Sequence, residues 1–492
     1  MDRPAADGVE WHKLERCPGS PRLVIVFSHI NEKPGRFSFY GTFRDIAVNK
    51  LFVNIPGNHW YQDGIPGLGD GIEAAADGIR IIMQDVAPRS VMCVGNSMGA
   101  YAALLFGTLI NADHILAIGP ETLLKLPGSR SRAFIGSRPD TGFDDLLPYL
   151  SLPSAGRKTD IIFGESDLID VHCARRVACL DGIQIRSLRG VGHEVPATLH
   201  RLEAWKPLID GYVRDGMLPS TLPLEGGLFK AGDAADALID GRRLRLDGMM
   251  KEARARLRHC LDLYPDADAA HDDLGLVDQH EGAFIRAEAS HRQALRLAPD
   301  RAIYQLHLGM ALARQGRDEE AEATLNAALS DASGSAAVHH QLGLLYAGQG
   351  RHGRAEAAQR AAIVEMLRHD QTAARPELIE AGRLQPARGE RLAGRLVEML
   401  QPFARSAPLG EGLAGPEPLG EIGDLVHEAD LGGEHRVGGV LGQLGRAHVH
   451  LHHAAAVAVE RRIQAPHHCQ RPRLAAAEHD ATSRSEEHTS EL

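Results

Sequence analysis

Ser97 stands between two glycines in the stretch GNSMG, residues 95–99, a spacing that could serve nucleophilic chemistry. The apolar residues 91–94 precede it and favour a strand buried on both faces, whereas residues 98–106, rich in alanine and leucine, favour a helix. A turn between such elements is strained, and glycine on either side of the serine removes the side chains that would clash as the chain reverses. The pattern predicts that Ser97 is a nucleophile held on a tight turn.

A serine hydroxyl attacks poorly unless a base takes its proton, and the base needs a third group that holds its tautomer and stabilises its positive charge. The stretch therefore predicts a histidine and a carboxylate elsewhere in the chain. GNSMG resembles the nucleophile elbow of the α/β-hydrolase fold, and the resemblance covers about residues 20–215. It implies a chain order of serine, acid and histidine, with the acid after one late strand and the histidine after the next.

Two late β-like runs lead into residues that suit these roles. The run 160–163 leads into GESDLID, where the acid of the family most often stands at the position of Asp167. The run 183–188 leads into RGVGHEVP, which places His193 on a glycine-flanked loop at the carboxyl end of the sheet. The resemblance therefore implies a triad of Ser97, Asp167 and His193.

The acid has alternatives in the same stretch. Asp167 could instead be the N-cap of the helix that begins near Val171, in which case Asp170 or Glu165 could supply the acid. An isolated histidine would more often be a surface or core residue, and only its place after the last strand favours His193 as the base.

The oxygen of an attacked carbonyl becomes negative and needs hydrogen-bond donors already in place. The resemblance implies the backbone N–H of Met98 as one donor and an N–H from the loop 27–41 as the other. Many relatives carry His-Gly in this loop, whereas this chain has His29-Ile30. Ile30 or Asn31 could therefore donate the second hydrogen bond.

Trp60 and Tyr61 follow the apolar run 51–55 and are expected at the same end of the sheet. They could form a wall of the substrate pocket or pack against their own loop, and the sequence favours neither.

The elements that must position these residues form an alternating pattern over residues 1–218, which is typical of a parallel sheet covered by helices on both faces. The expected strands are 23–28, 51–55, 91–94, 115–118, 160–163 and 183–188. The hydrolase fold begins with an antiparallel pair of strands. Only about twenty residues precede the first clear strand here, so we expect this core to be trimmed at its start.

Residues 219–233, which begin with PSTLPLEGG, are expected to be a linker that lets the parts on either side move independently. Residues 234–367 repeat with a period of 34, which resembles four tetratricopeptide repeats and implies an all-α solenoid that binds a protein partner. Three columns carry the repeat: Gly241, Gly275, Gly309, Gly343; Gly248, Gly282, Gly316, Gly350; and Ala253, Ala287, Ala321, Ala355.

Residues 368–492 lack helical or strand periodicity and contain no lysine and one aromatic residue, Phe403. We expect this tail to be disordered, or wholly or partly an assembly or reading-frame artefact. The histidines in HVHLHH, residues 448–453, are interpreted as biased composition and not as a metal site.

The composition of the 492 residues limits the classes of partner that the protein can bind. A formal charge of -11 and a sequence pI near 6.2 argue against nucleic acid as a partner. No apolar run reaches the length of a membrane span, and the six cysteines contain no C-x-x-C pair. We therefore expect a cytoplasmic protein without a membrane span, metal or cofactor.

These observations favour a serine hydrolase of small acyl esters or thioesters, fused to a protein-binding helical module. The alternative is a non-catalytic scaffold in which the hydrolase part is vestigial. The complete set of Ser97, Asp167 and His193 favours the enzyme, whereas His29-Ile30 favours the scaffold.

Overall fold

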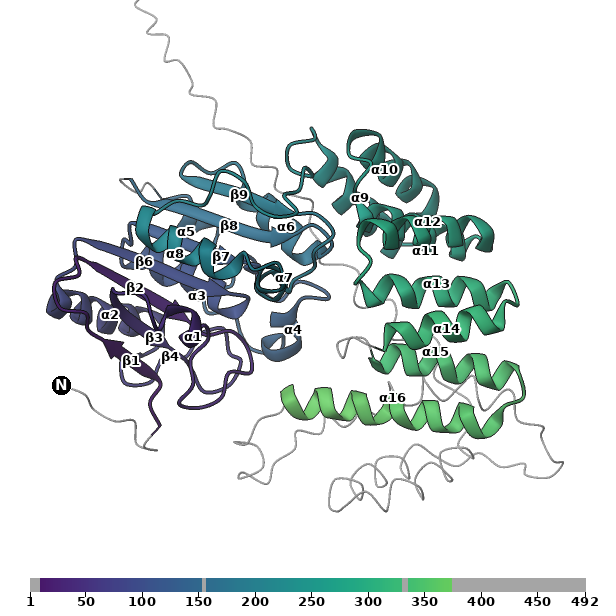
Figure 1. Cartoon of the computed structure of the whole chain (residues 1–492), viewed down its shortest axis with the longest axis horizontal. Helices are drawn as coiled ribbons and strands as arrows, with labels where there is room; N and C mark the ends of the chain where they lie inside the picture. The colour runs from purple at the N-terminus through teal and green to yellow at the C-terminus, as the bar shows by residue number, and fades with distance from the viewer. Residues whose placement is uncertain (1–8, 153–155, 330–334, 374–492) are drawn as a thin grey trace, which may run out of the picture.

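The computed structural model describes residues 9–152, 156–329 and 335–373 of the chain. A mostly parallel sheet forms the N-terminal part, and paired helices form the C-terminal part (Figure 1). The strands lie in the order β1-β3-β2-β6-β7-β8-β9. Their bounds are β1 (His12–Glu15), β2 (Arg22–Phe27), β3 (Asn49–Val53), β6 (Ser90–Asn96), β7 (His114–Ile118), β8 (Lys158–Gly164) and β9 (Ile183–Leu188).

Each of the six expected strands is present, and neighbouring members of this set run parallel. β1 pairs antiparallel with β3 at one edge of the sheet. It is the one described strand that precedes β2. The prediction of a mostly parallel sheet is therefore confirmed.

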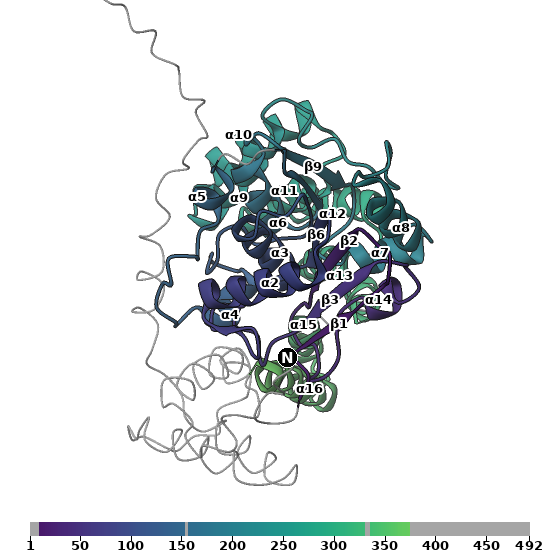
Figure 2. The same cartoon turned by 90° about the vertical axis from the view of Figure 1, so that its left-hand side faces the viewer.

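The sheet is covered on both faces, which explains why its central strands β2, β6 and β7 are almost continuously apolar. Leu23, Ile25 and Phe27 contribute to one core and Val24 and Val26 to the other, as the alternation of side chains along a strand requires. Figure 2 shows α2 and α3 on one side of the strands and α8 on the other. The main covering helices are α2 (Ile72–Val86), α3 (Met98–Leu109), α6 (Leu168–Val177), α7 (Val195–Arg201) and α8 (Trp205–Asp215).

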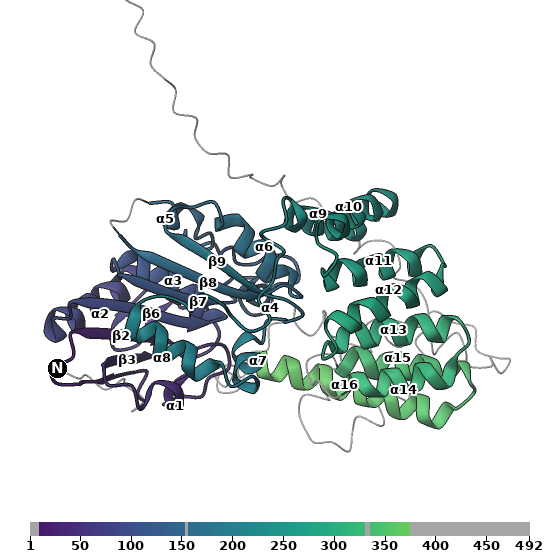
Figure 3. The same cartoon turned by 45° about the horizontal axis from the view of Figure 1, so that its top comes forward.

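In the described residues, the helical part consists of four antiparallel pairs stacked beside the sheet (Figure 3). The pairs are α9 (Ala234–Leu246) with α10 (Met250–Leu263), α11 (Asp268–His280) with α12 (Phe284–Leu297), α13 (Ala302–Arg314) with α14 (Asp318–Ala328), and α15 (Ser335–Gly348) with α16 (His352–Ala373). Helix α16 continues past residue 367, so residues 368–373 are helical and the expectation of no helix there is wrong. The rest of the expected tail, including residues 448–453, lies outside the described residues.

The three columns of small residues have clear physical roles. The first glycine column lies where two helices approach each other. For example, a Cβ at Gly241 would lie 2.7 Å from the side chain of Leu257 in the partner helix. The second column, represented by Gly248 with φ of 78°, takes the left-handed conformation that ends a helix. The alanine column, represented by Ala253, is buried.

Residues 219–233 do not form the independent linker expected from the sequence. The backbone N–H of Gly226 donates to Ser187 O over 2.7 Å, and Leu188 forms a bridge with Glu225. Leu228 is buried. The segment is therefore packed against the edge of the sheet at β9. The prolines and glycines of this segment form a packed turn and do not make it a flexible linker.

The helical repeats and the sheet share one hydrophobic core. Leu228, Leu238 and Leu257 belong to the same buried cluster as the apolar side chains of α2 and α3. At its surface, the guanidinium of Arg175 in α6 donates twice to the Asp236 carboxylate in α9, each time over 2.7 Å. The two parts are thus joined by apolar packing as well as by charge.

A chain that ends at residue 227 is therefore expected to aggregate or to lose its cooperative unfolding, because the apolar side of α6 that faces α9 would be exposed to water. A chain that ends at residue 329 retains α9 to α14 and is the matched control. Size-exclusion chromatography and thermal unfolding of both chains provide the measurement. If the shorter chain is monomeric with an unchanged melting temperature, the repeats are an independent module after all.

The second repeat contains a buried polar pair in its core, Asp272 and His291, where its neighbours have leucine, and His307 of the third repeat also contacts Asp272. His291 Nδ1 lies 2.8 Å from Asp272 Oδ1, and His307 Nδ1 lies 2.9 Å from Asp272 Oδ2. In the 34-residue register, the positions of Asp272 and His291 correspond to Leu238 and Leu257 in the first repeat and to Leu306 and Leu325 in the third.

The double variant Asp272→Leu, His291→Leu is therefore expected to be more stable than Asp272→Leu alone, because it removes both members of the buried pair and restores the leucines of the neighbouring repeats, while His307 loses its contact with Asp272 in both variants. Asp272→Leu alone should lower the free energy of unfolding by about 1–3 kcal/mol, because the buried His291 ring loses its partner at Nδ1. Urea unfolding of the full chain measures both. A double variant less stable than the single variant would contradict the argument.

No helix of the described residues combines the length and the apolar character needed to cross a bilayer. The cytoplasmic location stays a prediction.

Candidate active site

Ser97 lies at the junction of β6 and α3 with φ of 55° and ψ of −120°, a strained conformation for a residue with a side chain. A Cβ at Gly95 would lie 2.0 Å from Gly99 O, and a Cβ at Gly99 would lie 2.3 Å from Phe27 O. Neither position admits a larger residue without moving the backbone. The two glycines therefore make the tight turn possible.

His193 lies on the loop after β9, and its carboxylate partner is Asp170. His193 Nδ1 lies 2.8 Å from Asp170 Oδ2 and 3.0 Å from Asp170 Oδ1. Asp170 is buried in the first turn of α6. The sequence left this residue open as an alternative, and the structure brings it to His193 in place of Asp167.

Asp167 has a different position, which corrects the assignment of the acid. Its Oδ1 accepts hydrogen bonds from the backbone N–H groups of Ile169 and Asp170, each over 3.1 Å, so it is the N-cap of α6. Its Oδ2 accepts a hydrogen bond of 2.6 Å from Arg130 Nη2. Its oxygens are thus engaged with the helix terminus and with Arg130, whereas Asp170 hydrogen bonds to His193.

Glu165, the other alternative, is also engaged elsewhere. Its carboxylate accepts hydrogen bonds from Ser187 Oγ at 2.7 Å, from the Leu228 backbone N–H at 2.9 Å and from the Tyr264 hydroxyl at 2.9 Å. These contacts join the loop between β8 and α6, residues 165–167, to the packed segment 219–233 and to the repeats.

Ser97 and His193 lie beside two consecutive residues of the chain, Ile118 and Gly119 respectively. The N–H of Ser97 donates to Ile118 O over 2.9 Å. The next residue, Gly119, has φ of 57°, and a Cβ there would lie 3.0 Å from both Nδ1 and Cε1 of His193. The glycine therefore leaves space for the imidazole beside the turn that carries the serine.

Charges around His193 set its protonation. Burial lowers the pKa of His193, but the charge of Asp170 and the hydrogen bond to it raise the pKa by more, so the net shift is upward. Burial raises the pKa of Asp170, and the nearby charge of Asp167 adds to this, against the effect of His193. Burial also raises the pKa of Asp167, but Arg130 overcomes this and brings it to about 2.

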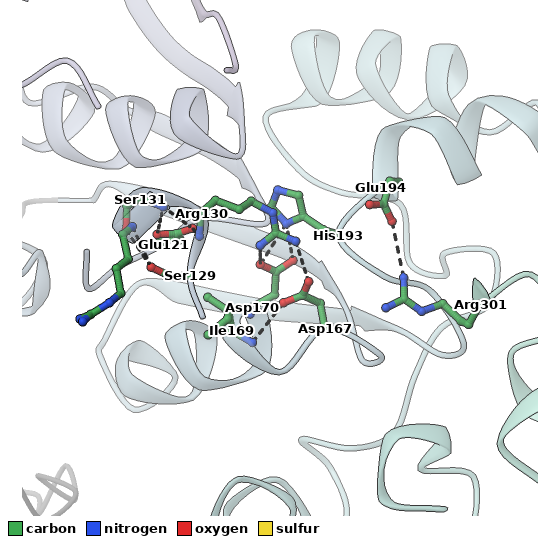
Figure 4. A network of polar contacts seen from close by, with 11 residues as sticks. Glu121, Ser129, Arg130, Ser131, Asp167, Ile169, Asp170, His193, Glu194 and Arg301 are labelled. Atoms are coloured by element: carbon green, nitrogen blue, oxygen red, sulfur yellow. Dashed lines mark hydrogen bonds and ion pairs between the residues drawn. The ribbon is translucent and has the colours of Figure 1, made fainter. Parts of the chain in front are cut away.

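Arg130 is a site residue that the sequence did not indicate. It is the first residue of α4 (Arg130–Ile135), and Figure 4 shows its side chain beside Asp167, Asp170 and His193. Its Nη1 lies 3.8 Å from Asp170 Oδ1. No motif points to this arginine, because it comes from a segment between strands that has no fixed spacing from the triad.

This arrangement can hold one tautomer of His193. With Nδ1–H directed at Asp170, Nε2 carries the lone pair and can accept a proton. Nε2 is buried and has no hydrogen-bond partner among the described residues. A base in this state suits proton abstraction from a hydroxyl.

The candidates for the oxyanion hole differ in what they already bind. Met98 is the first residue of α3, where backbone N–H groups lack partners within the helix. The N–H of Asn31 donates to Asn58 Oδ1 over 2.8 Å, so Asn31 is engaged elsewhere. Ile30 is half-buried, and its carbonyl lies 2.7 Å from His29 Nδ1. Its N–H remains the candidate for the second donor.

Trp60 and Tyr61 are both buried. The Tyr61 hydroxyl donates to Ser28 O over 2.9 Å, and its ring packs edge-on against Phe27, so Tyr61 belongs to the core. Trp60 faces Phe134 of α4 with 5.9 Å between ring centres. Its Nε1 is buried with no hydrogen-bond partner in the described part of the chain, so Trp60 stays a candidate for the pocket wall.

Comparison with known proteins identifies the last repeat. Residues 336–363 match the family model of the tetratricopeptide repeat. This segment is a tetratricopeptide repeat. A search of the curated proteins found no match to this chain.

Several solved structures resemble parts of the chain. One is the capsule O-acetyltransferase of Neisseria meningitidis serogroup A, at 17% identity and a TM-score of 0.32, over 41% of this chain and 94% of that one. Another is MenH from S. aureus, at 13% identity and a TM-score of 0.30, over 42% and 98%. A third is PilF of Pseudomonas aeruginosa, at 20% identity and a TM-score of 0.29, over 45% and 86%. At such scores these likenesses carry no argument about function.

Among the described residues, two groups of side chains bring potential metal ligands within 4.8 Å of one another. In the group of Asp167, Asp170 and His193, the Arg130 guanidinium already provides the positive charge. In the tetratricopeptide-like part, Asp272 is hydrogen-bonded to His291 and His307. Hydrogen bonds within the chain thus account for both groups, and neither supports a metal proposal.

Proposed function

We propose that the chain is a serine hydrolase of ester or thioester bonds with an α/β-hydrolase type of N-terminal domain, about residues 1–218. Ser97 is the nucleophile, His193 the base and Asp170 the acid. The observation that carries the proposal is the 2.8 Å contact between His193 Nδ1 and Asp170, beside a serine held in a strained strand-to-helix turn. Repeats over residues 234–367 bind a protein partner in this proposal.

The reaction follows from these roles. Ser97 Oγ attacks the acyl carbonyl carbon while His193 Nε2 takes its proton. The N–H groups of Met98 and Ile30 stabilise the oxyanion of the tetrahedral intermediate. The intermediate collapses when His193 returns the proton to the leaving alcohol or thiol. Water then attacks the acyl-serine by the same route and releases the carboxylic acid.

The experiment is turnover by the purified full chain of a panel of short and long acyl esters and thioesters. We expect hydrolysis of at least one member, and the preferred chain length will define the acyl pocket. The alternative, a non-catalytic scaffold, is favoured by His29-Ile30 in place of the His-Gly of many relatives. A chain that binds a protein through its repeats and hydrolyses no member of the panel would support that alternative.

The pH dependence should report the environment of His193. A base must be neutral, and because the pKa of His193 is raised, its inactive protonated form persists to higher pH than for an ordinary histidine. The acid limb of kcat/KM should therefore lie above the usual histidine range. Asp167→Asn removes a negative charge that raises this pKa, so its acid limb should move to lower pH. An acid limb that moves to higher pH, or stays in place, would count against His193 as the base.

A further inference from the structure

The first turn of α13, in the third repeat, contacts the loop of His193 (residues 189–194, the histidine loop) directly, and it contacts the loop before α6 (residues 165–167, the acid loop) through Asp268. Arg301 precedes this helix, and Tyr304 lies three residues later. Arg301 contacts the histidine loop. Tyr304 is connected to the acid loop through Asp268, at the start of α11. These contacts cross from the repeats to the sheet.

The acid loop is held by a buried hydrogen-bonded chain. Ser166, next to the cap residue of α6, donates its hydroxyl to Asp268 Oδ2. The Tyr304 hydroxyl donates to the same oxygen over 2.7 Å. Asp268 and Tyr304 are buried, so water does not compete readily for these bonds. A shift of α13 would therefore also displace the first turn of α6, which carries Asp170.

The histidine loop rests directly on the repeats. A Cβ at Gly192 would lie 2.0 Å from Arg301 Nη1, and a Cβ at Gly190 would lie 2.6 Å from Leu297 O. Arg301 Nη1 also lies 3.7 Å from the carboxylate of Glu194, and Figure 4 shows this pair beside His193. The residues on either side of His193 thus face the side chain of Arg301.

We propose that Tyr304, Asp268 and Arg301 are positioning residues, which hold the start of α6, with Asp170, and the loop of His193 at the positions that the hydrogen bond between Asp170 and His193 requires. This rests on the proposed hydrolase function. The repeats then complete the active site as well as binding a partner. A partner that displaces α13 would change kcat without touching the substrate.

Tyr304→Phe is the sharpest test, because it removes one hydroxyl and retains the buried ring. We expect kcat to fall about ten- to hundredfold with KM nearly unchanged, as small misplacements remote from the chemistry can cause. Tyr346→Phe is the matched control, since its hydroxyl donates over 2.9 Å to Glu322 within the repeats, away from both loops. Asp268→Asn retains one acceptor oxygen and should be more active than Asp268→Ala.

The measurements are kcat and KM at a temperature well below each melting temperature, with the rate of fluorophosphonate labelling of Ser97. A purely structural role would lower the melting temperature and leave both rates unchanged. A labelled parent, with kcat of Tyr304→Phe within twofold of the Tyr346→Phe control, would overturn the positioning role alone. A parent that is neither labelled nor active would overturn the hydrolase function and this role with it.

Discussion

Ser97→Ala is expected to reduce ester turnover by about 10⁶-fold, the loss that follows removal of a serine nucleophile in a triad. The fold should be retained, because the tight turn depends on Gly95 and Gly99, and alanine meets the same backbone strain at φ of 55° as serine does. Thermal unfolding and steady-state turnover of the same preparation are the measurements.

The control for this variant is Ser151→Ala, which removes the hydroxyl of an exposed serine that donates to Leu147 O after α5 (Leu147–Leu150). We expect its turnover to equal that of the parent. Residual turnover of Ser97→Ala within tenfold of the parent would mean that another group is the nucleophile.

Asp170→Asn should reduce kcat by about 10⁴-fold, because the asparagine amide would donate to His193 Nδ1 and leave the proton on Nε2, which is the wrong tautomer for a base. Asp170 is also buried, so no water can readily replace its carboxylate. Steady-state kinetics at the pH optimum of the parent measure this loss.

Asp167→Asn is the matched variant, three residues away in the same turn. Asparagine is as good an N-cap as aspartate, so α6 should stay intact, while the ion pair with Arg130 is lost. We expect less than tenfold loss of kcat. If Asp167→Asn proves the more damaging of the two, the contact of Asp170 with His193 is not the one used in catalysis.

Much of the sheet could be predicted because strands buried on both faces are nearly continuous apolar runs, and the turn at Ser97 because only glycine permits the backbone contacts of residues 95 and 99. The columns at Gly241 and Gly248 likewise follow from local constraints, a close helix contact and a left-handed residue. Such constraints act within one element or between adjacent elements, and they leave a pattern in the sequence.

The identity of the acid could not be predicted in the same way. Asp167 and Asp170 lie in one turn. Asp167 hydrogen-bonds to Arg130, which comes from a distant segment that no motif marks, and Asp170 hydrogen-bonds to His193. The packing of residues 219–233 against the sheet could not be predicted from the sequence either, because proline and glycine occur in packed turns as well as in linkers. Long-range contacts such as that of Tyr304 with Asp268 leave no periodic signal.

Activation of the Ser97 hydroxyl is tested most directly with a fluorophosphonate probe, since such probes react with activated serine hydroxyls. The full chain is incubated with the probe, and the adduct is located by mass spectrometry of its peptides. We expect one adduct per chain, on Ser97; the adduct should be absent in Ser97→Ala and should form much more slowly in Asp170→Asn. An adduct on another residue, or an unmodified chain with an intact fold, would contradict this expectation.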